Sequence, residues 1–259
     1  MAESTWQTAI TEVKPNELRL RGYRIDELMG KCSFPETVWL AWMSELPRPE
    51  WVPLITALFT ASIDHGVTPP SALSTRIATG TGASISQAVA AGVLSINASH
   101  GGAIEGCMKA LHRGVALLED GVDYSTAAAK LLAALKAEGK RMPGFGHRVH
   151  SNDPRTARLR ELSRQAGVYG CHLQLADAIE EHFQAQGKPL PLNVDGAVAA
   201  VLCELGMDPL IGNAFFILPR VAGLVAHFAE ERIRERVMRR IDQSAAEYDG
   251  EKARDVYDH

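Results

Sequence analysis

The chain has 259 residues, of which 46% are hydrophobic and 22% charged, a composition typical of a globular protein with a buried core. Its 27 basic and 31 acidic residues give a formal charge of −4, which provides no reason to expect nucleic acid or an anionic membrane as a partner. The polar N-terminus is unlike a signal or transit peptide, and the apolar runs are broken by Gly, Pro or His. We therefore expect a cytoplasmic protein with no membrane span.

The four cysteines, Cys32, Cys107, Cys171 and Cys203, are scattered and too few for a disulfide framework, so reduced thiols are expected. Cys171 stands beside His172, a pair that could begin a metal site. Two adjacent residues cannot supply a tetrahedral shell, however, and no second pair occurs at ligand spacing. The sequence therefore predicts no metal site.

Short extended pieces are expected over the first two dozen residues, and helices after them. Ser33 is predicted to cap a helix that ends near Glu45, with Glu36 closing a capping box and Pro35 in the first turn. Three further helices are indicated by apolar stripes: Cys107, Leu111, Val115 and Leu118; Leu173, Ala176, Ile179 and Phe183; and Ala197, Val201 and Leu205.

The longest helix is predicted over residues 213–241, with a kink near Pro219. Glycine-rich breaks at 80–82, 101–102 and 144–146 separate the helices. Because no sustained run of β-branched residues alternates with period two, the sequence predicts an all-α fold.

His100 lies in the first segment that suggests chemistry, Ser-His-Gly-Gly-Ala at 99–103, just before an amphipathic helix. Gly101 and Gly102 let the backbone approach a ligand, and a helix N-terminus favours negative charge. A histidine held there stays neutral and can donate a hydrogen bond to a developing oxyanion. The alternative is a glycine-rich turn with an incidental histidine.

A second segment, residues 142–150, joins a proline and two glycines to a cluster that includes His147 and Arg148. Arg155 follows, with a guanidinium suited to bidentate carboxylate binding. The glycine spacing matches neither a P-loop nor a Rossmann fingerprint. A solvated basic loop is the alternative interpretation.

Asp195 begins an Ala/Val/Leu helix and could be its N-cap, or a carboxylate base, or both. Arg220 sits on a largely apolar helix, where an unpaired cation would be costly to bury. Either a salt bridge within the fold or an anionic ligand would satisfy it, and His65 in Asp-His-Gly at 64–66 is grouped with it.

In this order, the segments resemble the citrate synthase superfamily over nearly the whole chain. The resemblance begins at residues 18–28, LRLRGYRIDEL, which is similar to the family's opening pattern RGY-x-I-x-EL. It continues through Asp64-His65, His100-Gly101-Gly102, Gly144-Phe145-Gly146-His147-Arg148-Val149, Asp153-Pro154-Arg155, Asn193-Val194-Asp195 and Arg220.

The resemblance implies an all-α, citrate synthase-like fold of two domains, with the active site in the cleft between them. The large domain would comprise residues 1–103 and 207–259, and the small domain residues 104–206. The family works as a homodimer, so a homodimer is expected.

The resemblance also implies the roles of the residues. Asp195 would take a proton from the methyl group of an acyl-CoA, His100 would stabilise the enolate, and His147 would polarise the oxaloacetate carbonyl. The residues expected to hold substrate carboxylates are His65, Arg155, Arg220 and, from across the dimer, Arg240, although Ile241 stands where the family has proline. Those expected to receive CoA are Met142, Pro143, Gly144, Phe145, Gly146 and Arg148.

Gly66 replaces the acidic residue that usually follows the histidine, which resembles citryl-CoA lyases and the lyase module of ATP-citrate lyase. The connection from His147 to Arg155 is one residue shorter than in ordinary synthases, and the chain itself is shorter. The favoured activity is cleavage of citryl-CoA into acetyl-CoA and oxaloacetate, with the CoA thioester as substrate and no permanently bound cofactor. The alternatives are a citrate or 2-methylcitrate synthase and a non-catalytic protein that binds CoA or carboxylates.

Overall fold

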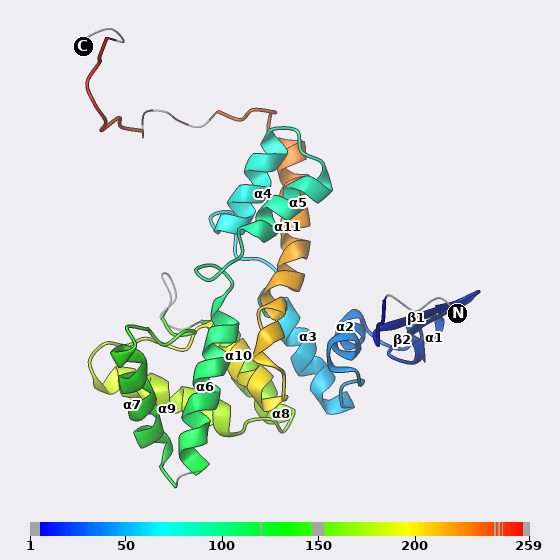
Figure 1. The fold of residues 1–259 in the computed structure, drawn as a ribbon, viewed down its shortest axis with the longest axis vertical. Coiled ribbons are helices and arrows are strands. Elements are labelled where there is room, and N and C mark those ends of the chain that lie inside the picture. Colours follow the sequence, from blue (N-terminus) through cyan, green and yellow to red (C-terminus); the bar gives the residue numbers. More distant parts are fainter. Residues whose placement is uncertain are drawn as a thin grey trace.

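The computed structural model describes residues 6–119, 121–146, 153–240, 242, 244 and 246–255. Helices dominate that part of the chain (Figure 1), which confirms the all-α prediction. The α-helices are α1 (Ile25–Leu28), α2 (Phe34–Met43), α3 (Val52–Ala61), α4 (Pro70–Gly80), α5 (Ile85–Leu94), α6 (Ala103–Glu119), α7 (Tyr124–Ala137), α8 (Pro154–Gln165), α9 (Cys171–Ala185), α10 (Val194–Glu204) and α11 (Ala214–Arg234). Two short 3-10 helices, η1 (Pro49–Trp51) and η2 (Pro209–Ile211), join them.

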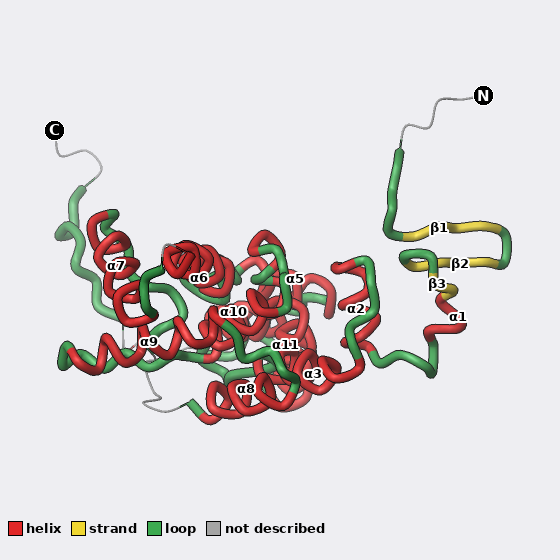
Figure 2. The backbone as a smooth tube through the Cα atoms, turned by 90° about the horizontal axis from the view of Figure 1, so that it is seen from below, coloured by secondary structure: helices red, strands yellow, loops and turns green. Residues whose placement is uncertain are grey.

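A small antiparallel sheet precedes the helices and confirms the extended pieces predicted near the N-terminus. Its strands are β1 (Thr11–Lys14), β2 (Glu17–Leu20) and β3 (Tyr23–Arg24), with Thr11 opposite Leu20. Figure 2 shows the sheet standing apart from the helical body. Arg21 ties it back to α2, because its Nη2 donates to the carbonyl of Ala41 at 2.9 Å.

The start of α2 confirms the predicted cap. Ser33 and Glu36 form a reciprocal capping box, and Pro35 lies in the first turn. The helix ends at Met43 rather than near Glu45, because Ser44 adopts a left-handed conformation with φ of 69°.

Aromatic packing connects α2 and α3 to the long helix α11. The ring centroids of Trp42 and Phe215 lie 5.2 Å apart, and those of Phe59 and Phe215 lie 4.9 Å apart in a stacked arrangement. This packing holds the C-terminal end of α3 against the first half of α11.

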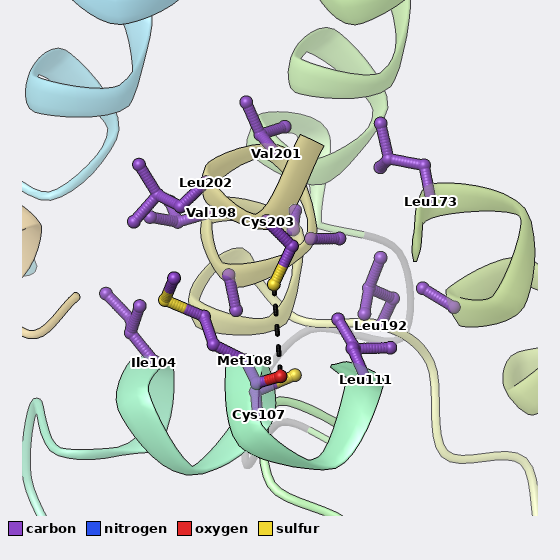
Figure 3. Close-up of a cluster of buried hydrophobic side chains, with 14 of the residues drawn as sticks. Ile104, Cys107, Met108, Leu111, Leu173, Leu192, Val198, Val201, Leu202 and Cys203 are labelled. Carbon is purple, nitrogen blue, oxygen red and sulfur yellow. Dashed lines mark hydrogen bonds between the residues drawn. The ribbon is translucent and has the colours of Figure 1, made fainter. Parts of the chain in front are cut away.

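Helix α10 is the centre of a second group of helices, packed by α6, α8 and α9. Its residues from Gly196 to Cys203 are buried, so the helix is apolar all round. Figure 3 shows Val198, Leu202 and Cys203 of α10 facing Cys107 and Met108 of α6.

Helix α11 runs between this group and the α4–α5 pair at the opposite end of the molecule (Figure 1). It ends at Arg234 and not at residue 241, because Glu235 is extended. Pro219 lies inside it, as the sixth residue of the helix.

By length and composition, the segment Pro209–Arg234 could cross a membrane, since an 18-residue window within it has a mean hydropathy of 1.5. The sequence argument that every apolar run is too broken for a membrane span is therefore wrong for this segment. In the fold it packs against α3, α4 and α5. It also carries buried Arg220, His227 and Glu231, and Arg76 pairs with Glu231 at 2.6 Å. Three ionisable groups held by protein partners are typical of a core helix, since they would be costly in lipid.

Candidate functional site

Two arginines from distant parts of the chain meet at the C-terminal end of α3. Nη1 of Arg155 donates to the carbonyl of Ala61 at 3.2 Å, and Nε of Arg220 donates to the carbonyl of Ser62 at 3.2 Å. The last carbonyls of a helix lack intrahelical partners and carry partial negative charge. The end of α3 therefore orients both guanidinium groups.

Arg220 is 2% exposed, and its guanidinium lies 4.5 Å from the ring centroid of Phe216. Burial lowers the pKa of Arg220, while the charges of Asp64 and Asp195 raise it. None of the ion pairs found among the described residues includes Arg220. The internal salt bridge considered for this residue is therefore not seen there, and an anionic ligand is the better partner.

Arg155, whose guanidinium is expected to bind a substrate carboxylate, is itself held by Asp153. Its Nε and Nη2 donate to the two Asp153 oxygens at 3.0 and 2.7 Å. Asp153 also caps α8 by accepting from the backbone N–H of Arg155. The guanidinium of Arg155 is thus held in one orientation before a substrate binds, which limits the side-chain entropy that Arg155 loses on binding.

Asp195 lies in the first turn of α10, where the cap is Asn193, whose side chain accepts from the N–H of Gly196 at 3.1 Å. The interpretation of Asp195 as the N-cap is therefore wrong, and its carboxylate is available for other contacts. Burial raises the pKa of Asp195, and the nearby charges of Arg155 and Arg220 lower it in part. A partly buried carboxylate facing two cations is typical of a proton-transfer group.

His100 precedes α6 and points at α4 and α11. Its Nε2 lies 2.8 Å from the hydroxyl oxygen of Ser71, and its ring meets Phe216 edge-on at 5.5 Å between centroids. Burial, and then the charge of Arg220, lower the pKa of His100. A neutral imidazole is therefore favoured, and with Nε2 engaged by Ser71 its Nδ1 can donate to a ligand.

The predicted CoA segment, Met142 to Gly146, is docked on the residues that begin α10. The N–H of Gly146 donates to the carbonyl of Pro191 at 2.7 Å, and Nδ2 of Asn193 donates to the carbonyl of Gly146 at 2.8 Å. Gly144 is required here, because a Cβ would lie 2.6 Å from the Cα of Gly196. His147 and Arg148, which continue this segment, lie outside the described residues.

His65 lies in the exposed loop after α3, beside Asp64. Asp64 accepts from the N–H of Gly66 at 2.9 Å, and its Oδ1 lies 3.0 Å from Nε2 of His227. Gly223 on α11 lets this loop approach, since a Cβ there would lie 2.2 Å from the carbonyl oxygen of Ile63.

Ser71, His227 and Gly223 are supporting residues that sequence reasoning missed. Ser71 is 29 residues from His100, and His227 is 163 residues from Asp64. Neither pair forms a local motif, so only the packing of α4 and α11 brings them together.

Arg240 lies far from the other predicted carboxylate ligands of its own chain. Arg220 is near the start of α11, and the helix continues to Arg234, about 21 Å further along its axis at about 1.5 Å per residue. Just before Arg240, the N–H of Met238 donates to the carbonyl of Gly80 at the end of α4. The fold therefore brings His100, Arg155, Asp195 and Arg220 to one region and leaves Arg240 outside it. His65 lies on the adjacent loop, three residues after the Ser62 carbonyl that Arg220 binds.

Comparison with known proteins gives a family for this arrangement. The profile of the family described as "Citrate synthase, C-terminal domain" matches residues 43–241. The structure of citryl-CoA lyase from Hydrogenobacter thermophilus is 37% identical, with a TM-score of 0.88 and 98% of each chain covered. An ATP citrate lyase of Methanosaeta concilii, in complex with (3S)-citryl-CoA, shares the fold with a TM-score of 0.84 at 22% identity, over 97% of this chain and 43% of that one.

Curated relatives are more distant and mostly longer. A probable ATP-citrate synthase of Dictyostelium discoideum is 25% identical over 87% of this chain and 38% of its own length. Citrate synthase 2 of Bacillus subtilis is 29% identical over 75% of this chain and 51% of its own. The chain thus spans about half or less of the length of the curated relatives it matches.

Proposed function

The chain belongs to the citrate synthase family, and on that premise we propose that it cleaves citryl-CoA into acetyl-CoA and oxaloacetate. One arrangement carries the chemistry: partly buried Asp195 lies near the charges of Arg155 and Arg220, and His100 and Arg220 both contact the ring of Phe216. The lyase direction is supported by the 37% identity to a citryl-CoA lyase over 98% of both chains.

In cleavage, a base removes the proton from the citryl hydroxyl group, and the electron pair of the breaking carbon–carbon bond passes to the thioester as an enolate. We assign the base to His147, as the family motif implies. His100, held by Ser71 at 2.8 Å, would donate to the enolate oxygen as charge develops. Protonated Asp195 would then give its proton to the enolate carbon, and burial favours that protonated form by raising its pKa.

The substrate carboxylates explain the two arginines. Arg220 is buried without an ion-pair partner among the described residues, and Arg155 presents a guanidinium already oriented by Asp153. His65 would complete this set from the loop after α3. Because an uncompensated buried cation is costly, a bound carboxylate would relieve the cost at Arg220.

We propose the segment from Met142 to Gly146, with Arg148, as the CoA contact and the CoA thioester as substrate rather than resident cofactor. The segment's attachment to the residues that precede α10 supports this, because it would bring the thioester next to Asp195.

We also propose that the chain forms two domains, a large one of residues 1–103 and 207–259 and a small one of residues 104–206. In that division Asp195 and Arg220 come from different domains.

A homodimer in the cytoplasm completes the proposal. The α4, α5 and α11 end of the molecule exposes apolar side chains, among them Ile77 at 59%, Leu94 at 82% and Ile233 at 83%. Such a face is typical of an interface. Arg240 follows the same end, so in a dimer it could reach the partner's site.

Incubation of the purified protein with citryl-CoA tests the activity, with oxaloacetate followed by reduction to malate. We expect oxaloacetate release, and a loss of about 10²- to 10⁴-fold in Asp195→Asn, the usual contribution of a proton-transfer group. Glu247→Gln, at an exposed position in the C-terminal segment, is the matched control and should leave the rate unchanged.

Other outcomes would identify the alternatives. Rapid release of free CoA from acetyl-CoA or propionyl-CoA plus oxaloacetate, without citryl-CoA cleavage, would make the protein a synthase. Binding of citryl-CoA without turnover in either direction would make it a non-catalytic protein of the family.

A further inference from the structure

Helix α10 carries a second cluster of reactive side chains at the end opposite Asp195. Cys203 and Glu204 close the helix, eight or nine residues after Asp195, which is about 12 Å along the axis. His112 of α6, and Cys171 and His172 at the start of α9, lie against this end. The mechanism proposed above uses none of these groups.

The two histidines face each other across the α6–α9 contact. Nδ1 of His112 and Nε2 of His172 are 3.2 Å apart. Two imidazole nitrogens bound to one tetrahedral zinc ion lie about 3.3 Å apart, given Zn–N distances of about 2.0–2.1 Å. One ligand atom from each of His112, His172 and Cys203 falls within 4.8 Å of the others.

Cys203 directs its sulfur at α6. Its thiol contacts the carbonyl oxygen of Met108 at 3.9 Å (Figure 3), and His112 follows Met108 by four residues, one helical turn later. Cys203 is buried, whereas His112 is exposed. The group therefore has a sulfur ligand inside and an edge open to solvent, from which an ion and a water ligand can enter.

Glu204 supports His172 from the other side of the ring. Its Oε1 accepts from the backbone N–H groups of His172 and Leu173 at 2.8 and 3.0 Å, and its Oε2 lies 3.6 Å from Nδ1 of His172. Gly170 leaves room for this carboxylate, since a Cβ would lie 2.3 Å from Oε2. A carboxylate on the second nitrogen of a histidine fixes the ring and raises its basicity as a metal ligand.

We propose that His112 Nδ1, His172 Nε2 and Cys203 Sγ form a binding site for Zn²⁺, with Glu204 orienting His172 and water as the fourth ligand. Two imidazoles and one thiolate suit zinc among the abundant divalent cations, since magnesium and calcium prefer oxygen ligands. Binding releases the thiol proton of Cys203 to solvent.

The ionisation of the groups is compatible with this assignment. Partial desolvation of the ring, and then the neighbouring His172, lower the pKa of His112, which favours the neutral imidazole that binds metal. Burial raises the pKa of Cys203, so the ion must displace a proton there. The sequence did not indicate this site because its three ligands lie on three different helices. The adjacent pair Cys171 and His172, the only cue in the sequence, contains just one of these ligands.

Titration of the chelator-treated, reduced full chain with Co²⁺, followed by displacement with Zn²⁺, tests the proposal. We expect one equivalent of Co²⁺ to give the intense visible bands of a tetrahedral site and a thiolate-to-cobalt charge-transfer band. Cys203→Ser should abolish the charge-transfer band, and Cys32→Ser, at a cysteine outside the cluster, should retain it.

His112→Gln keeps the test independent of folding, because residue 112 is exposed. The substitution should lower the affinity for Zn²⁺ by more than roughly 10- to 100-fold, the loss that is usual when a residue hydrogen-bonded to a metal ligand is removed. It should also abolish the rise in unfolding temperature that Zn²⁺ produces in the unsubstituted protein. His182→Gln, at the far end of α9, should behave as the unsubstituted protein.

Three results would overturn the site: no stoichiometric binding, equal affinity in His112→Gln, or a charge-transfer band that survives Cys203→Ser and disappears in Cys171→Ser.

Discussion

At the scale of single residues, the candidate site holds charges in places where water does not fully solvate them. Burial raises the pKa of Asp195 and lowers the pKa values of His100 and Arg220. Each shift disfavours the charged form, so each ionised group there reduces the stability of the folded protein. Such costs are typical of functional sites, where the group with the shifted pKa binds a ligand or transfers a proton.

Asp195→Asn should therefore stabilise the fold while it removes activity. Because the folded-state pKa is raised, the folded protein binds more protons than the unfolded chain, and stability falls as pH rises from the unfolded pKa through the folded one. We expect a higher unfolding temperature for Asp195→Asn at pH 7 and no difference near pH 3, where both states are protonated.

The exposed substitution Asp249→Asn is the control for that experiment and should change neither temperature. A lower unfolding temperature for Asp195→Asn at both pH values would show that the carboxylate stabilises the fold instead.

Ser71→Ala tests the orientation of His100. The substitution removes the hydroxyl that lies 2.8 Å from Nε2, and one hydrogen bond contributes about 0.5–1.5 kcal/mol. We expect kcat for citryl-CoA cleavage to fall roughly 2- to 12-fold with KM unchanged, since Ser71 acts through the imidazole. Ser74→Ala, one turn later on α4, should have no such effect, and equal losses in both variants would contradict the assignment.

At the scale of elements, the site depends on backbones that approach more closely than side chains allow. The segment from Met142 to Gly146 lies against the first turn of α10, and a Cβ on Gly196 would be 2.2 Å from the carbonyl oxygen of Gly144. The same principle brings the loop at Ile63 and Asp64 against Gly223 of α11. Glycines at helix contacts thus position the segments of the candidate site.

Gly196→Ala should separate the predicted CoA segment from α10. We expect a loss of about 1–3 kcal/mol in unfolding free energy, measured by urea denaturation, because the added methyl group must push backbone aside. Gly80→Ala, where the nearest atom is Glu231 Oε1 at 4.0 Å, should be neutral or stabilising. Similar losses in both variants would contradict the close-packing argument.

At the scale of the whole molecule, α11 joins the candidate site to the apolar α4–α5 end. Arg220 near its start belongs to the site, whereas Glu231 near its end pairs with Arg76 of α4. Any contact made at that end therefore acts on the same helix that positions Arg220. If the proposed dimer forms through this end, the arrangement gives a physical reason for it to support catalysis.

Ile77→Glu should break the proposed dimer. It places a charge on the exposed apolar face of α4, where burial against a partner would be costly. Light scattering should give twice the 28.1 kDa chain mass for the unsubstituted protein and one chain mass for the variant. Val13→Glu, at a residue 75% exposed on the N-terminal sheet, should remain a dimer, and a monomeric unsubstituted protein would refute the proposal.

The sequence alone was enough for features that depend on neighbouring residues. Apolar spacing predicted the helices, the Ser33–Glu36 pattern predicted a capping box that is present, and the ordered motifs identified the family. Each of these features depends on residues close together in the sequence, or on several such motifs in a set order. The sequence alone is therefore sufficient to predict it.

Only the tertiary structure decided which residues far apart in the sequence lie in contact. It showed that Asn193, not Asp195, caps α10, that Asp153 holds Arg155, and that α11 stops at Arg234. It also brought His112 to His172 and Cys203, which no spacing in the sequence suggested. The physical reason is the same in each case: side chains from separate helices meet only when burial of the apolar faces packs those helices together.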